Sequence, residues 1–105
     1  MNIPEVITAL IAAQNHSNSQ AYSECFAETA VVFDEGKTYK GKAAIKSWIE
    51  KANQQYKTQM KPLEYAETEQ ILKAEISGTF PGSPLVLSYN FDIRNGSIHA
   101  LKISA

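Results

Sequence analysis

The sequence predicts an α+β fold, in which three helices in the N-terminal half cover one face of a curved, mostly antiparallel sheet. Two observations lead to this prediction. Apolar residues recur at helical spacing up to about residue 52, and from residue 72 onward they alternate with polar residues, as they do in strands. Helices that precede a run of consecutive strands are typical of α+β layer folds.

The first two helices are marked by residues that start and stop helices. Asn2, followed by Pro4, predicts a helix start, and the polar segment NHSNS predicts that this helix ends near Asn15. Asn18 or Ser19 is expected to cap a second, shorter helix.

A short strand and a third helix follow. The β-branched apolar run Ala30–Phe33 predicts the first strand. The charged segment 35–41 is expected to be a loop, and the helical period returns at Lys42 and fades in the polar residues 53–55.

The second half of the chain is expected to form three or four antiparallel strands. The expected strands are residues 56–66, 72–80, 85–93 and 97–103. Pro62 removes a backbone donor, so the first of these strands is expected at an edge or with a bulge. The dipeptide Asn95-Gly96 predicts a tight hairpin, since both positions of a type I′ turn need positive φ.

Composition indicates one ordinary globular domain, residues 1–105, with 44% hydrophobic and 20% charged residues. The net charge is -1 and the basic residues are scattered, so we expect no nucleic-acid partner. The single cysteine, Cys25, excludes an internal disulfide and favours a cytoplasmic location. No run approaches the roughly 18 apolar residues of a membrane span, so we expect no membrane partner.

The first strand ends in two carboxylates, Asp34 and Glu35. If Asp34 faces an apolar pocket, desolvation would raise its pKa and make it a usable general base. The alternative is that Asp34 only ends the strand and is hydrated. Glu35 points to the opposite side of a strand from Asp34, so we expect it to face solvent.

Two further residues are candidates for the same site. Tyr89 lies on the apolar face of a core strand, where it can pack or donate a hydrogen bond into a cavity. His99 shares a face with Leu101 and Ile103 and is either a satisfied core residue or a partner of Asp34 in proton transfer. The catalytic candidates are therefore Asp34, Tyr89 and His99.

Pocket walls are expected from large apolar side chains, each of which can equally belong to the plain core. The candidates are Leu10, Phe33, Trp48, Tyr56, Phe80 and Leu101. The two histidines lack the spacing of metal ligands, so we expect no metal and no cofactor.

Three segments carry a resemblance to a known superfamily. They are AAQNHSNSQAYSECFAETAVVFDEG, YKGKAAIKSWI and LSYNFDIRNGSIHALKI. Together with the order of elements, they resemble the cystatin-like cone of the nuclear-transport-factor-2-like proteins. The chain is most similar to the SnoaL-like branch, which includes polyketide cyclases and ketosteroid isomerases. The resemblance implies a cone-shaped sheet with a pocket between sheet and helices.

The resemblance also implies roles for single residues. Asp34 falls where the isomerases place their general-base aspartate, and Tyr89 falls where they place a protonated aspartate. Leu10 falls where they place an oxyanion-hole tyrosine, and a leucine cannot donate a hydrogen bond. The resemblance to the isomerase pattern is therefore partial.

These observations leave several functions open. The chain is expected to bind a small apolar or amphipathic molecule. It is either a proton-transfer enzyme of isomerase, cyclase or dehydratase type that acts on a small apolar carbonyl compound, or a non-catalytic ligand-binding or protein-interaction domain. A cavity filled by side chains is a third alternative. The mildly polar outer sheet face, together with the resemblance, leads us to expect a homodimer.

Overall fold

The computed structural model describes residues 2–105, which form three helices and one six-stranded sheet. The helices are α1 (Glu5–Asn15), α2 (Ser19–Glu24) and α3 (Lys42–Tyr56). The strands are β1 (Phe26–Asp34), β2 (Lys37–Lys40), β3 (Gln59–Ala66), β4 (Ile71–Ser77), β5 (Leu85–Arg94) and β6 (Ser97–Ser104). The predicted α+β fold is confirmed.

The sheet has the order β2-β1-β6-β5-β4-β3. All neighbouring strands are antiparallel except β1 and β6, which run parallel with Val32 opposite Leu101. The sheet is therefore mostly antiparallel, as expected. Because the last strand inserts between β1 and the β3–β5 meander, it joins the two halves of the chain into one sheet.

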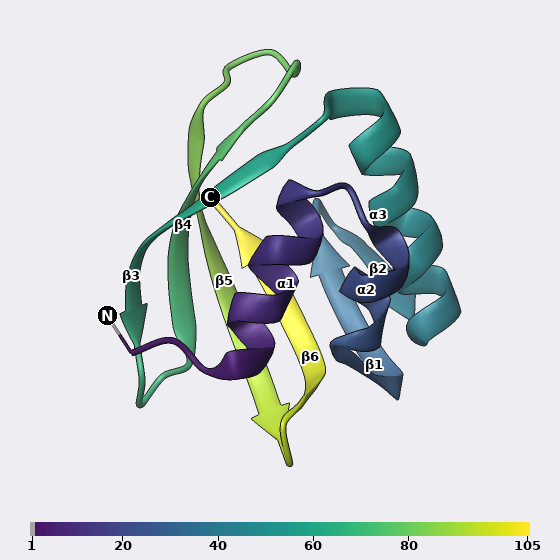
Figure 1. Cartoon of the computed structure of the whole chain (residues 1–105), viewed down its shortest axis with the longest axis vertical. Helices are drawn as coiled ribbons and strands as arrows, with labels where there is room; N and C mark the ends of the chain where they lie inside the picture. Colours follow the sequence, from purple (N-terminus) through teal and green to yellow (C-terminus); the bar gives the residue numbers. More distant parts are fainter. Residues whose placement is uncertain (1) are drawn as a thin grey trace.

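Figure 1 shows the three helices on one side of this sheet, with α1 crossing in front of β5 and β6 and α3 beside β1 and β2. Ile7 and Leu10 of α1 are completely buried, as are Val32 and Leu101 on the facing strands. Full burial of one such side chain stabilises the fold by about 1.5–3 kcal/mol. This apolar layer holds α1 and the sheet at a fixed separation.

The helix ends agree with the expectations except at the N-terminus. Asn18 caps α2, because its side-chain oxygen accepts a hydrogen bond from the backbone N–H of Ala21 at 3.0 Å. The expected cap at Asn2 is wrong. The α1 helix begins after Pro4, which has no side-chain acceptor, and its carbonyl accepts the first N–H groups, from Ile7 and Thr8.

The segment 35–41 was expected to be a loop, and this expectation is wrong. Residues Lys37–Lys40 form β2 and pair with the end of β1. Glu35 and Gly36 both have positive φ, 51° and 74°, as do Asn95 and Gly96 in the predicted hairpin, at 50° and 76°. The same two-residue turn geometry therefore occurs twice, once with a glutamate in a position that usually favours asparagine or glycine.

Two of the three register shifts in the sheet bear on the expectations from the sequence. The β3–β4 register shifts between Pro62 and Glu64, on the edge strand β3, which confirms the expected bulge. The β5–β6 register shifts between Asp92 and Ile93, whose partners are Ala100 and Ile98, so His99 has no opposite residue. A bulged residue interrupts the alternation of faces along its strand.

Gly78 follows β4 at a point where another backbone segment passes close by. A Cβ at this position would lie 2.6 Å from the carbonyl oxygen of Tyr56 and 3.2 Å from the ring of Phe80. The strand ends at Ser77, so the expected extension of the strand to Phe80 is wrong.

We expect Gly78→Ala to lower the free energy of unfolding by about 1–3 kcal/mol, the usual cost of forcing extra atoms into a packed site. Urea unfolding measures this change. Ser77→Ala, on the neighbouring residue, is the control and should stay within about 0.5 kcal/mol of the wild type. Equal stability of Gly78→Ala and the control would contradict the close approach.

The outer face of the sheet carries exposed apolar residues beside charged ones. Phe33 is 43% and Val86 is 52% exposed, and Lys73 forms an ion pair with Glu64 at 3.2 Å. The homodimer through this face stays a prediction. Within residues 2–105, none of the helices has the length and apolar character needed to cross a membrane.

Candidate functional site

A partly enclosed cleft of about 980 Å³ lies between α3 and the inner face of the sheet, beneath the loop that joins β4 to β5. Aromatic side chains from α2, α3, β2, β5 and that loop line it. They are Tyr22, Tyr39, Trp48, Tyr56, Phe80 and Tyr89. A cleft with mostly apolar walls and a few polar groups is the usual form of a small-molecule site.

The aromatic rings hold one another in place. Trp48 stacks on Tyr39 with ring centres 5.3 Å apart and meets Tyr22 edge-on at 6.2 Å. On the other wall, Tyr56 and Phe80 meet at 90° with ring centres 6.0 Å apart. Both arrangements are favoured geometries for aromatic pairs, so they stiffen the cleft without filling it.

Asp34 is the last residue of β1 and lines the cleft. Alternation along the strand places it there, because Val32 is buried under the helices, Phe33 points outward, and Asp34 points inward again. The pKa of Asp34 is raised to about 6, mainly by burial and also by the charge of the neighbouring Glu35, with a partial offset by the backbone N–H of Glu35. The carboxyl group therefore titrates close to neutral pH.

Tyr22 and Tyr89 place two hydroxyl groups in the same cleft. Their side chains are only 2% and 7% exposed, and neither hydroxyl has a hydrogen-bond partner within residues 2–105. No fully buried polar side-chain atom in this part of the chain is left without a partner, so both hydroxyls must be open to the cleft.

The charge of Asp34 acts on both hydroxyls, which share its cleft. Burial raises the pKa of Tyr22 and Tyr89 above the usual value for tyrosine, and the negative charge of Asp34 raises each further. Both hydroxyls therefore keep their protons at neutral pH and can donate hydrogen bonds. The cleft thus combines one basic carboxylate with two free donors.

Some of the residues that the sequence suggested for the site line the cleft, and others do not. Asp34, Tyr89, Trp48, Tyr56 and Phe80 all line the cleft.

The expectation was wrong for three of the wall residues, Leu10, Phe33 and Leu101. Leu10 and Leu101 are completely buried in the core beneath α1 and do not reach the cleft, and Phe33 lies on the outer sheet face.

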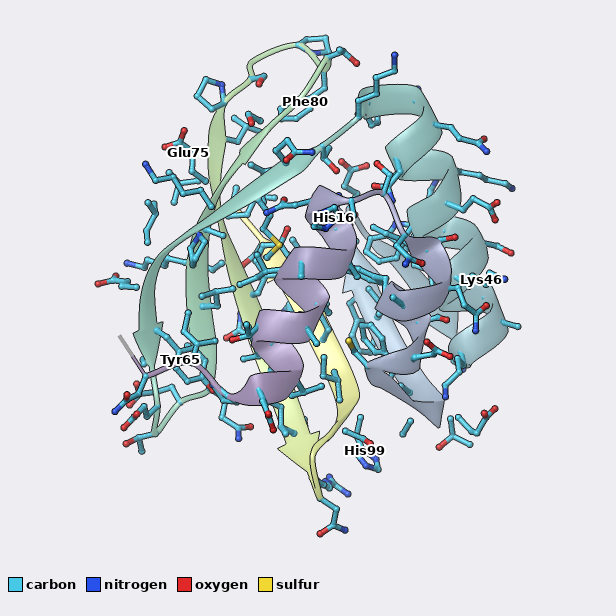
Figure 2. All side chains as sticks on the ribbon, in the orientation of Figure 1. His16, Lys46, Tyr65, Glu75, Phe80 and His99 are labelled. Atoms are coloured by element: carbon cyan, nitrogen blue, oxygen red, sulfur yellow. The ribbon has the colours of Figure 1, made fainter. Side chains whose placement is uncertain are left out.

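His99 is not among the residues that line the cleft. It lies in the β5–β6 bulge, so it does not share the face of Leu101. Figure 2 shows it near the lower end of β6, at the opposite end of the molecule from Phe80. The expected grouping of His99 with Asp34 and Tyr89 is therefore corrected, and Tyr22 lines the cleft with Asp34 and Tyr89 instead.

Tyr22, Tyr39 and Gln14 were missed as cleft residues. Tyr22 belongs to the short helix α2, and nothing in its sequence spacing shows that its hydroxyl reaches a cavity. Tyr39 was missed together with β2. Among residues 2–105, no group of three or more histidine, cysteine, aspartate or glutamate side chains is placed to hold a metal ion.

Comparison with solved structures assigns the fold to a family. A candidate polyketide cyclase from Sinorhizobium meliloti is 36% identical and superposes with a TM-score of 0.90, over 97% of this chain and 95% of that one. The chain belongs to the SnoaL-like polyketide cyclase family. No protein-family model and no curated protein matches the chain.

More distant structures share the fold of this family. A protein from Catenulispora acidiphila with a ketosteroid-isomerase-like fold, in complex with trimethylamine, is 20% identical and has a TM-score of 0.87, over 99% of this chain and 87% of that one. A nuclear-transport-factor-2-like protein from Cytophaga hutchinsonii is 16% identical and has a TM-score of 0.77, over 99% and 91% of the two chains.

Proposed function

We propose that the cleft binds a small apolar or amphipathic carbonyl compound and that Asp34 removes a proton from the carbon next to the carbonyl. One observation carries this proposal: a half-buried carboxylate with a pKa of about 6 shares the cleft with two tyrosine hydroxyls that have no partner in the protein. Pockets that combine apolar walls with a perturbed carboxyl group are favoured sites for such chemistry.

The pKa of Asp34 suits a general base at neutral pH. A pKa of about 6 leaves most of the carboxyl groups ionised at pH 7, yet makes each a stronger base than a free aspartate with its pKa of about 3.9. General bases work best when their pKa lies near the working pH. Burial, the main cause of the raised pKa, therefore also strengthens the proposed base.

The hydroxyls of Tyr22 and Tyr89 suit the other half of the reaction. When the proton moves from carbon to Asp34, the electrons of the broken C–H bond shift to the carbonyl oxygen, which becomes an enolate oxygen. Donors that point to such an oxygen stabilise it in a water-poor site, and each can contribute about 10²–10³ in rate. The carboxyl proton on Asp34 can exchange with water because the cleft is only partly enclosed, and a proton from Asp34 then returns to the same carbon or another carbon of the bound molecule.

Membership of the SnoaL-like family supports this class of reaction, and the candidate polyketide cyclase that is 36% identical has a name consistent with it. Return of the proton to a different carbon would make an isomerase, and attack of the enolate carbon on a second carbonyl would make a cyclase. The alternative is a binding protein with the same cleft.

Deuterium exchange at a simple ketone tests the proposal. With 2-tetralone in D₂O, we expect the folded protein to replace the α-protons with deuterium, as followed by proton NMR. The rate should rise with pH around a midpoint of about 6, as Asp34 ionises, and stay level up to about pH 10, because both tyrosine pKa values lie above the usual one.

The heat-unfolded protein at the same concentration is the control for catalysis by exposed carboxylates. Exchange no faster than with this control, under conditions where 2-tetralone binds to the folded protein, would contradict the enzyme and support the binding protein.

A further inference from the structure

Gln14, near the end of α1, forms part of the cleft wall and is 5% exposed. Its amide nitrogen donates to the side-chain oxygen of Asn53 at 2.9 Å, to the hydroxyl of Thr58, and more weakly to the carbonyl of Thr58 at 3.4 Å. The surrounding chain is also held, because the Asn15 side chain forms two hydrogen bonds with the backbone of Met60, at 2.7 and 3.0 Å. Gln14 is therefore a fixed group.

The partners of Gln14 determine which way its amide points. The carbonyl of Thr58 can only accept, and the hydroxyl of Thr58 donates to the oxygen of Asn53, at 3.5 Å. The amide nitrogen thus lies against three oxygens, and turning the amide over would place its oxygen against the Thr58 carbonyl, which cannot donate. The nitrogen faces Asn53 and Thr58, and the oxygen, Oε1, faces away from them.

Oε1 has no donor within residues 2–105. Since no fully buried side-chain oxygen in this region lacks a partner, Oε1 is open to the cleft that Gln14 lines. A nearly buried acceptor without a partner is unfavourable, and a bound molecule with a matching donor removes that cost. Such a group also discriminates, because a molecule without the donor leaves it unpaired.

We infer that Gln14 is a recognition residue, whose Oε1 accepts a hydrogen bond from a hydroxyl or N–H group of the bound molecule. The substrate class follows when this role of Gln14 is combined with the proposed function, on which this part rests. The substrate is then a carbonyl compound with a second polar group that can donate a hydrogen bond. The carbonyl faces the tyrosine hydroxyls and Asp34, and the donor faces Gln14. An entirely apolar ketone fits the cleft but leaves Oε1 without a partner.

Matched ligands test the inference by calorimetric binding. The donor series is 2-tetralone carrying a hydroxyl or an acetamido group at ring position 6 or 7, and the methoxy compounds serve as the series without a donor. We expect at least one donor compound to bind about three- to tenfold more tightly than its methoxy partner, the ratio typical of one hydrogen bond. Comparing the hydroxyl with the acetamido compounds shows whether Gln14 prefers an O–H or an N–H donor.

The variant Gln14→Met keeps the length of the side chain and removes the acceptor. The donor advantage should disappear in this variant and persist in Gln54→Met, a matched change at an exposed α3 residue outside the cleft. An equal donor advantage in Gln14→Met, or none in the wild-type protein, would overturn the inference.

A second measurement does not depend on whether Gln14→Met folds. In the wild-type protein, the donor compound should shift the ¹⁵N–¹H resonances of the Gln14 side-chain amide more than the methoxy compound does. Equal shifts would also overturn the inference. These experiments measure binding, whereas the proposed function is tested by deuterium exchange. Failure of one can therefore be distinguished from failure of the other.

Discussion

Replacing Asp34 by asparagine is expected to slow deuterium exchange at 2-tetralone by about 10²- to 10⁴-fold, the usual contribution of a positioned general base. The amide keeps the size of the carboxyl group but cannot accept the proton. Binding of 2-tetralone should change little, because the apolar walls and the tyrosine donors remain. Exchange rates at pH 8, together with the dissociation constant, separate the two effects.

Glu35→Gln is the matched control for Asp34→Asn. Glu35 is the neighbouring carboxylate, exposed at the rim of the cleft, and its charge contributes to the raised pKa of Asp34. Its loss should leave the plateau rate within about threefold and move the midpoint of the pH profile to lower pH. A loss of activity in Glu35→Gln as large as in Asp34→Asn would contradict the assignment of the base.

The same Asp34→Asn change should stabilise the protein above neutral pH. The folded pKa of Asp34, about 6, exceeds the value of about 3.9 expected in the unfolded chain, so the folded state binds this proton more tightly. The resulting stabilisation is complete below about pH 4 and is lost as pH rises through about 6. A difference of about two pKa units corresponds to about 2–3 kcal/mol, which partial solvent exposure reduces to about 1–2 kcal/mol.

Urea unfolding at two pH values measures this effect. Asp34→Asn should exceed the wild type by about 1–2 kcal/mol at pH 8 and match it at about pH 3, below the unfolded pKa. Opposite effects of one substitution on activity and stability are typical of residues that a protein keeps for function. A loss of stability at pH 8 would show that the Asp34 carboxylate is held by favourable contacts.

Local signals in the sequence account for much of the fold. Asn18 and the Asn95-Gly96 turn act through their own backbone, so their effects could be predicted without knowing the rest of the structure. The turn at Glu35-Gly36 has the same geometry as Asn95-Gly96, but glutamate rarely adopts positive φ, and β2 was missed for that reason.

The site was predictable only as far as strand alternation extends. Asp34 and Tyr89 lie on regular strand segments, so their inward direction follows from their neighbours. His99 was misplaced because a single bulge breaks the alternation, and bulges have no reliable signal in one sequence. Tyr22 and Gln14 were missed for a different reason. Packing between distant elements determines which atoms of a buried side chain reach a cavity, and one sequence does not show that packing.

Tyr22 and Tyr89 give the second large effect. Tyr22→Phe and Tyr89→Phe each remove one donor while keeping the ring, and each should slow deuterium exchange by about 10²-fold or more if its hydroxyl stabilises the enolate oxygen. The double variant should lose less than the product of the two effects, since one remaining donor can move toward the oxygen. Exchange rates at pH 8 provide the measurement.

Stability and a third tyrosine distinguish this role from packing. Because neither hydroxyl has a partner within residues 2–105, removing it breaks no internal hydrogen bond, and the free energy of unfolding should stay the same or rise. Tyr39→Phe removes a hydroxyl from a ring of the same cleft that stacks on Trp48, and it should keep the exchange rate within about threefold. If Tyr39→Phe slows deuterium exchange as much as Tyr22→Phe does, the polarity of the whole cleft causes the effect. The two buried hydroxyls would then have no specific role in the reaction.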